Sequence, residues 1–79
     1  MKVKVLFFAS FREVVGHSSQ TFELSEGETT SDLFAHISQI YPSLLLESIS
    51  VVVNKKYISD PVILMDGDEV AFCPPISGG

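Results

Sequence analysis

The residues of this chain with the clearest chemical potential are Gly78 and Gly79, which close the sequence after two prolines. Glycine has no Cβ, so two consecutive glycines form a strip of backbone narrow enough to enter a channel that excludes side chains. A terminal carboxylate is a poor electrophile, and it transfers its acyl group only after activation, for example as an acyl adenylate made from ATP. We therefore expect the carboxylate of Gly79 to be the reactive group, with other proteins activating it.

The proline pair determines how this group would be presented. Pro74 and Pro75 have no backbone N–H and hold φ near the polyproline value, so a sheet cannot continue through them. We expect one domain over residues 1–73 and an extended tail over residues 74–79. The residues expected to thread into a partner are Pro74, Pro75, Ile76, Ser77 and Gly78.

Other chemistry is weakly represented in the sequence. It contains no phosphate-binding glycine loop and no nucleophile elbow. His17 and His36 have no second ligand at a metal-like spacing, which favours surface roles for both. A lone cysteine in a strand, such as Cys73, is more often a small apolar packing residue than a sulfur relay. The sequence therefore predicts no metal site and no permanently bound cofactor, and ATP would be used only by an activating partner.

Composition indicates one folded domain. The chain has 79 residues, 46% of them hydrophobic and 19% charged, with a formal net charge of -5. This charge would repel phosphate backbones, so no nucleic-acid partner is expected. Apolar stretches fall far short of the roughly 20 residues that cross a bilayer, so no membrane partner is expected either. The single cysteine and the absence of a targeting segment favour a cytosolic location.

The first half of the chain predicts two strands and a helix. Alternation in residues 2–9 indicates a strand that buries Val3, Val5 and Phe7 and leaves Phe8 exposed on its other face. A short helical turn would end at Gly16, and a second strand would cover residues 20–24.

A helix should begin at Thr29 or Thr30, with Asp32 completing a capping box, and Pro42 should stop it. Three- and four-residue spacings give this helix one apolar stripe for the inner face of the sheet. The stripe consists of Leu33, Phe34, Ile37, Ile40 and Tyr41.

The second half predicts strands at residues 49–53 and 69–73. A turn at residues 54–57 would lead into a short return strand, residues 66–68 would form another turn, and the pattern leaves 59–65 undecided. The order of elements gives an α+β domain with one main helix packed across one face of the sheet. Phe8, Ala71 and Cys73 would then lie together on the open face near the tail, either as a patch that binds a partner or as ordinary half-buried strand positions.

The chain resembles a known family, the small sulfur-carrying subunits of molybdopterin synthase. The residues that carry the resemblance are Val5-Leu6-Phe7-Phe8-Ala9, Arg12-Glu13, Gly16, Val53-Asn54, the run from Asp66 to Phe72, and Pro74-Pro75-Ile76-Ser77-Gly78-Gly79. The resemblance implies a ubiquitin-like β-grasp fold with a mixed sheet. The family often has an aromatic residue where this chain has Cys73.

The resemblance also implies a mechanism. An E1-like adenylyltransferase would use ATP to adenylate Gly79, and sulfur from a persulfide donor would then convert it to a thiocarboxylate. The tail would next enter the large subunit of molybdopterin synthase and donate sulfur to cyclic pyranopterin monophosphate, which builds the dithiolene of molybdopterin. The chain would not be an enzyme on its own but the sulfur-donating subunit of a sulfurtransferase complex, typically a heterotetramer.

Two alternatives stay open at this stage. The chain could carry sulfur to another acceptor, in thiamine synthesis or tRNA thiolation. It could also be a ubiquitin-like protein modifier, because an activated Gly79 acyl group can react with an amine as well as with a sulfur nucleophile.

Overall fold

The computed structural model describes residues 1–46 and 48–75. Glu47 and the predicted tail residues Ile76, Ser77, Gly78 and Gly79 lie outside the described residues. In chain order the elements are β1 (Lys2–Phe7), α1 (Ser10–Val15), β2 (Ser19–Glu23), α2 (Thr30–Ile40), the 3-10 helix η1 (Pro42–Leu46), β3 (Ser50–Val53), β4 (Lys56–Ile58) and β5 (Glu69–Cys73).

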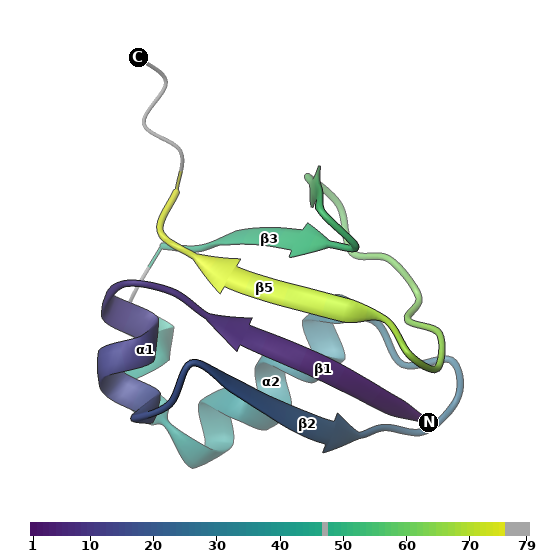
Figure 1. Cartoon of the computed structure of the whole chain (residues 1–79), viewed down its shortest axis with the longest axis horizontal. Coiled ribbons are helices and arrows are strands. Elements are labelled where there is room, and N and C mark those ends of the chain that lie inside the picture. The colour runs from purple at the N-terminus through teal and green to yellow at the C-terminus, as the bar shows by residue number, and fades with distance from the viewer. Residues whose placement is uncertain (47, 76–79) are drawn as a thin grey trace.

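The strands form one mixed sheet in the order β2-β1-β5-β3-β4. β1 and β5 run parallel at its centre, and all the other neighbours are antiparallel. The main helix α2 crosses one face of this sheet, and α1 lies at the end where β5 leads into the tail (Figure 1). The expected α+β architecture with one main helix across one face is confirmed.

The helix α2 begins as the sequence predicts. The Thr29 side chain accepts a hydrogen bond from the backbone N–H of Asp32, and the Asp32 carboxylate accepts one from the backbone N–H of Thr29 at 2.9 Å. These two bonds make a complete capping box, which satisfies donors that a helix N-terminus otherwise leaves unpaired. The helix ends at Ile40, directly before Tyr41 and Pro42.

The apolar stripe of α2 is shorter than predicted. Leu33 and Ile37 are fully buried, and Phe34 and Tyr41 pack against the core as partly buried side chains. Ile40 is 56% exposed, so its expected place in the stripe was wrong. It is the last residue of the helix, and the core beyond Ile37 is completed by Leu44 of η1, which is 1% exposed.

Strand alternation separates the two faces of the sheet as expected. Val3, Val5 and Phe7 of β1 are at most 1% exposed, and Val70 and Phe72 of β5 join them in the core. The ring of Phe72 lies 5.5 Å from that of Phe34, which joins the sheet to α2. The side chains that alternate with these core residues point away from the helices.

Tight turns fix the register of the second half. Asn54 and Lys55 join β3 to β4 with φ values of 48° and 71°, the left-handed conformation that a two-residue type I′ hairpin requires. The Asn54 side chain also bonds to Asp68 at 2.9 Å and to the backbone N–H of Glu69 at 3.0 Å. The hairpin is thereby tied to the predicted turn at residues 66–68.

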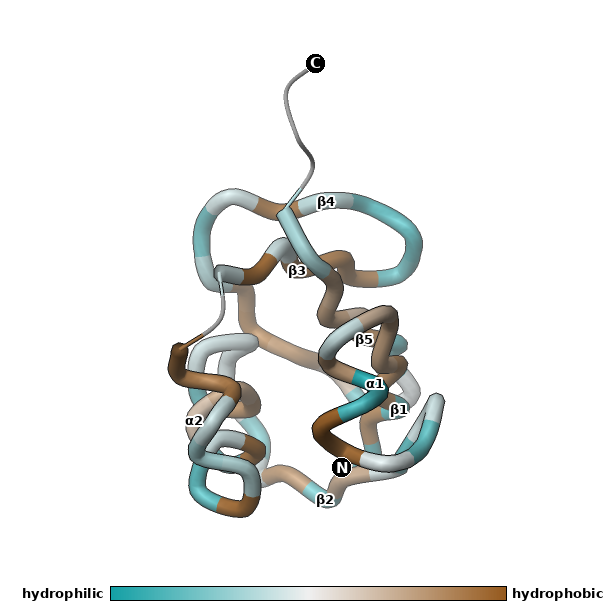
Figure 2. The backbone as a smooth tube through the Cα atoms, turned by 90° about the vertical axis from the view of Figure 1, so that its left-hand side faces the viewer, coloured by the Kyte–Doolittle hydropathy of each residue, from teal (hydrophilic) through white to brown (hydrophobic). Residues whose placement is uncertain are grey.

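Some strand bounds differ from the prediction. β1 ends at Phe7 rather than at residue 9, because the chain turns at Ala9 with a φ of 53°, and β3 begins at Ser50 rather than at residue 49. β2 starts and ends one residue earlier than expected, and the undecided segment 59–65 forms only an isolated bridge between Thr29 and Ile63. Figure 2 shows α2 to one side of the strands and β4 at the outer end of the sheet. No helix among the described residues lies over the opposite face of the sheet.

Candidate docking surface beside the tail

Four apolar side chains form a row across the uncovered face of the sheet. The register places Leu6 opposite Ala71, Ala71 opposite Val52, and Val52 opposite Tyr57. Directly opposite residues share a face of the sheet. The row therefore crosses β1, β5, β3 and β4 without a break.

Phe8 and Cys73 extend this row toward the tail. Both lie two residues further along their strands than Leu6 and Ala71, and the backbone N–H of Phe8 donates to the carbonyl of Phe72 at 3.3 Å. With Lys55 and Glu69 at its polar end, the surface encloses a groove of about 340 Å³. We call it the open-face groove, and its lining is Leu6, Phe8, Val52, Lys55, Tyr57, Glu69, Ala71 and Cys73.

A sharp turn keeps Phe8 on the open face. Ala9 has a φ of 53° and precedes α1, where Phe11 points back into the core and is 1% exposed. A positive φ is unusual for a residue with a side chain, and such conformations are often found at functional positions. Phe8 is left 49% exposed and Tyr57 59% exposed. Two aromatic rings thus flank the groove in contact with solvent.

The structure brings together the three residues predicted to bind a partner. Phe8, Ala71 and Cys73 all line the open-face groove. Ala71 is only 9% exposed and forms part of the floor, while the Cys73 thiol donates to the carbonyl of Ser50 at 3.6 Å. Their role in binding stays a prediction. Pro74 and Pro75 follow directly, are exposed and have no regular secondary structure.

Sequence reasoning missed Val52 and Tyr57 as members of this surface. Both belong to residue types that are common in strands, and neither stands near Phe8 or Cys73 in the sequence. They join the groove because β5 pairs with β3 and β3 pairs with β4. Only the strand order, which local pattern does not reveal, would have identified them.

The histidines do not form a metal site in the described part of the chain. His36 bonds through Nε2 to Glu28 at 2.8 Å, and no group of three potential metal ligands occurs among the described residues. The bond from His36, followed by one from the backbone N–H of Ser25, lowers the pKa of Glu28.

None of the described helices has the length and apolar character needed to span a membrane.

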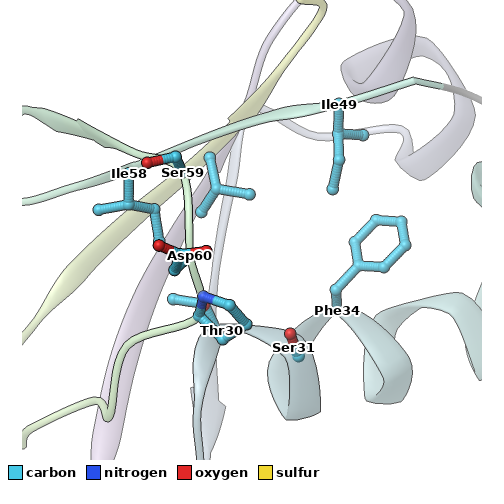
Figure 3. Close-up of a pocket in the computed structure, with 9 residues that line it drawn as sticks. Thr30, Ser31, Phe34, Ile49, Ile58, Ser59 and Asp60 are labelled. Carbon is cyan, nitrogen blue, oxygen red and sulfur yellow. The ribbon is translucent and has the colours of Figure 1, made fainter.

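A second hollow lies on the helix-covered side of the sheet, between α2 and the β3–β4 hairpin. It measures about 230 Å³ and is lined mainly by apolar side chains, with Ser31, Ser59 and Asp60 at its rim. In Figure 3, Phe34 and Ile49 lie on one side of this space and Ile58, Ser59 and Asp60 on the other. We call it the inner hollow.

Comparison with known families gives a match over nearly the whole chain. The family described as the ThiS family matches residues 5–79. A molybdopterin synthase sulfur carrier subunit from Chlamydomonas reinhardtii is 46% identical over 83 aligned residues, which cover 100% of both chains.

Solved structures agree with this match. A putative molybdopterin converting factor subunit 1 from Pyrococcus furiosus has a TM-score of 0.88 and 32% identity, covering 96% of this chain and 99% of its own. The small archaeal modifier protein 1 from Methanosarcina acetivorans has a TM-score of 0.81 and 28% identity, covering 99% of this chain and 96% of its own. One chain in the solved complex of subunits 1 and 2 of the molybdopterin-converting factor from Helicobacter pylori matches with a TM-score of 0.68 and 25% identity, covering 100% of this chain and 100% of its own length. The expected ubiquitin-like β-grasp fold is confirmed.

Proposed function

This chain belongs to the ThiS family, and we propose that it acts there as the sulfur carrier subunit of molybdopterin synthase. The observation that carries the proposal is the relationship to a sulfur carrier subunit of that synthase, at 46% identity over the full length of both chains. The terminal Gly78-Gly79 motif and the groove beside the tail give this assignment a physical basis.

The proposed reaction takes place at the carboxylate of Gly79. An E1-like enzyme joins this carboxylate to the AMP portion of ATP and releases pyrophosphate. The terminal sulfur of a persulfide donor then attacks the acyl carbon and AMP leaves, which joins Gly79 to the donor through an acyl disulfide. A thiol next attacks the donor's sulfur, forms a disulfide with it and releases the thiocarboxylate on Gly79. The thiocarboxylate sulfur next attacks cyclic pyranopterin monophosphate in the large subunit and forms a thioester. Water then cleaves the bond between this sulfur and the Gly79 acyl carbon, which leaves the sulfur on the pterin and restores the carboxylate, and two such transfers supply both sulfurs of the dithiolene.

The body and the tail have separate tasks in this proposal. The open-face groove supplies affinity for the large subunit, with Phe8, Ala71 and Cys73 in the contact. Pro74 and Pro75 direct the chain away from β5, so that Ile76, Ser77 and Gly78 can thread toward the acceptor. Holding sulfur on a tethered strip raises its effective concentration at the acceptor and orients it for attack.

The large subunit is the partner with the most direct support. The solved complex from Helicobacter pylori contains subunits 1 and 2 of the molybdopterin-converting factor, and this chain resembles one of its components over its full length. The activating enzyme and the persulfide donor belong to the proposal through the family resemblance, and a cytosolic location belongs to it through the sequence prediction. In this scheme the chain donates sulfur but provides no catalytic machinery of its own.

Mass spectrometry of the intact protein tests the proposal. The full chain is incubated with an E1-like adenylyltransferase, ATP and a persulfide donor, and a chain that ends at Gly78 serves as the control. The expected product is heavier by the difference between one sulfur and one oxygen, with fragmentation placing the change at Gly79. An unmodified terminus in the presence of an active adenylyltransferase would contradict the proposal.

A second function is favoured by one observation. The archaeal relative at 28% identity is named a modifier protein, and an adenylated Gly79 could also form an isopeptide bond with a lysine. The same incubation with added cell proteins separates the two functions. Linkage of Gly79 to lysine side chains would support the modifier, whereas a thiocarboxylate without such conjugates supports the carrier.

A further inference from the structure

The free edge of β4 offers main-chain groups that have no partner in the sheet. Within residues 1–46 and 48–75, β4 is the terminal strand of the sheet and pairs with β3 alone. An exposed edge strand presents N–H and C=O groups to which another strand can add. Which residue presents them depends on the phase of the hydrogen bonding between β3 and its two neighbours.

One backbone hydrogen bond sets that phase. The backbone N–H of Asn54 donates to the carbonyl of Glu69 at 2.8 Å, one residue beyond the Val53–Val70 pair. Along an antiparallel ladder, hydrogen-bonded pairs alternate with pairs that are not hydrogen-bonded. Since the main chain of Asn54 bonds to β5, that of Val52 also bonds to β5. The main-chain groups of Val51 and Val53 therefore bond to β4. Lys56 and Ile58 are the residues opposite Val53 and Val51. It follows that the N–H and C=O of Tyr57, between them, point to the free edge.

Apolar hollows flank this edge on both faces of the sheet. Tyr57 borders the open-face groove of about 340 Å³, and Ile58 borders the inner hollow of about 230 Å³. Successive side chains of a strand point to opposite faces. A strand added beside β4 would therefore place one side chain next to the groove and the following one next to the hollow.

The charges at the two ends of β4 have opposite signs. Lys55 and Lys56 stand at its beginning and are exposed, while Asp60 follows its end at the rim of the inner hollow. Hydrophilic segments on both sides of β4 are visible in Figure 2. Lysines on an edge strand discourage pairing with another copy of the same basic hairpin. They favour a segment that carries carboxylates at that end.

We propose that the β4 edge binds an extended segment of a partner protein as an additional antiparallel strand. In this segment a residue opposite Tyr57 exchanges two main-chain hydrogen bonds with it, and its neighbours are apolar. A basic residue precedes the apolar residues and lies near Asp60, and acidic residues follow them near Lys55 and Lys56. The proposal requires neither sulfur transfer nor a modified Gly79, so its test is independent of the test of the proposed function.

A designed peptide tests this binding mode by NMR. The probe is the blocked hexapeptide Lys-Val-Ile-Val-Asp-Glu, titrated into the full chain labelled with ¹⁵N. We expect saturable shifts centred on the amide of Tyr57 and slower hydrogen exchange there. An analogue with a methyl group on the isoleucine nitrogen keeps every side chain but removes one main-chain donor, and we expect it to bind about tenfold more weakly, equivalent to about 1.4 kcal/mol.

Two variants of the protein separate main-chain pairing from side-chain contact. Tyr57→Ala keeps the N–H at the edge, whereas Tyr57→Pro removes it without breaking a bond to β3. We expect the proline variant to bind the probe about tenfold more weakly than the alanine variant. Thr21→Pro is the matched control, because Thr21 has the corresponding position on the other free edge, β2. We expect the Thr21→Pro variant to bind the probe peptide as tightly as the parent chain does.

Three results would overturn the proposal. The first is equal binding of the methylated and unmethylated peptides, which needs no protein variant and is independent of folding. The second is a set of shifts that excludes Tyr57 and its neighbours. The third is concentration-dependent pairing of two copies through β4, measured by analytical ultracentrifugation, which would assign this edge to self-association instead.

Discussion

The two faces of the central strand pair differ sharply in what they contact. On the covered face, Phe7 and Phe72 are each 1% exposed and pack beneath the helices. On the open face, Phe8 is 49% exposed although it is adjacent to Phe7 in the chain. Apolar residues on the first face stabilise the domain, whereas those on the second remain available for a partner. Substitutions of neighbouring residues should therefore have different consequences.

The largest expected effect is on the covered face. Phe7→Ala removes a buried ring and leaves a cavity, so the free energy of unfolding should fall by about 3–5 kcal/mol. Phe8→Ala should lower it by less than about 1 kcal/mol, because much of its ring is already in contact with water. Urea denaturation followed by circular dichroism measures both. Equal losses would contradict the division between the faces.

The next effect concerns binding on the open face. Phe8→Ala should weaken the complex with the large synthase subunit by about 1–2 kcal/mol, in the range of an aromatic contact residue at an interface. Leu46→Ala is a suitable control, because Leu46 is 89% exposed and lies outside the groove. Isothermal titration calorimetry compares the two. If Leu46→Ala weakened binding as much as Phe8→Ala, the groove would not be the docking surface.

A smaller effect is expected at the start of α2. Thr29→Ala removes the side-chain half of the capping box, which should cost about 1 kcal/mol of stability. Thr29→Ser keeps a hydroxyl group and should retain most of the stabilisation. Thermal denaturation of both variants provides the measurement. A Thr29→Ala variant as stable as the parent chain would show that the observed bonds contribute nothing net.

The smallest effect is a dependence of stability on pH. His36 and the backbone N–H of Ser25 lower the pKa of Glu28 below its ordinary value of 4.5. A lowered pKa means that the stabilisation is complete above that ordinary value and is lost as the pH falls through the folded pKa. The free energy of unfolding of the Glu28→Gln variant should thus decline less steeply than that of the parent chain below about pH 4.5. At pH 3 the two proteins should have nearly the same free energy of unfolding. A steeper loss of stability with falling pH in the variant would contradict a lowered pKa of Glu28.

The sequence predicted the elements of this fold better than the surface they create. Alternation in β1 and the capping residues at the start of α2 are local signals, and both are visible without a structure, although the pattern left Thr29 and Thr30 open as the cap and extended the first strand to residue 9. Ile40 shows the limit of periodicity, since a residue at the right spacing becomes exposed where the helix ends. The same limit explains the groove: Phe8 and Cys73 could be placed by alternation, but Val52 and Tyr57 join them only through pairings between distant segments.

The central claim is that the last residue of the tail carries sulfur while the folded body only docks. The most direct measurement compares the full chain with a chain that ends at Gly78 in a reconstituted synthesis of molybdopterin, with circular dichroism recorded on both. The account predicts native spectra for the two proteins and dithiolene formation with the full chain alone. Normal product formation by the shortened chain would contradict it.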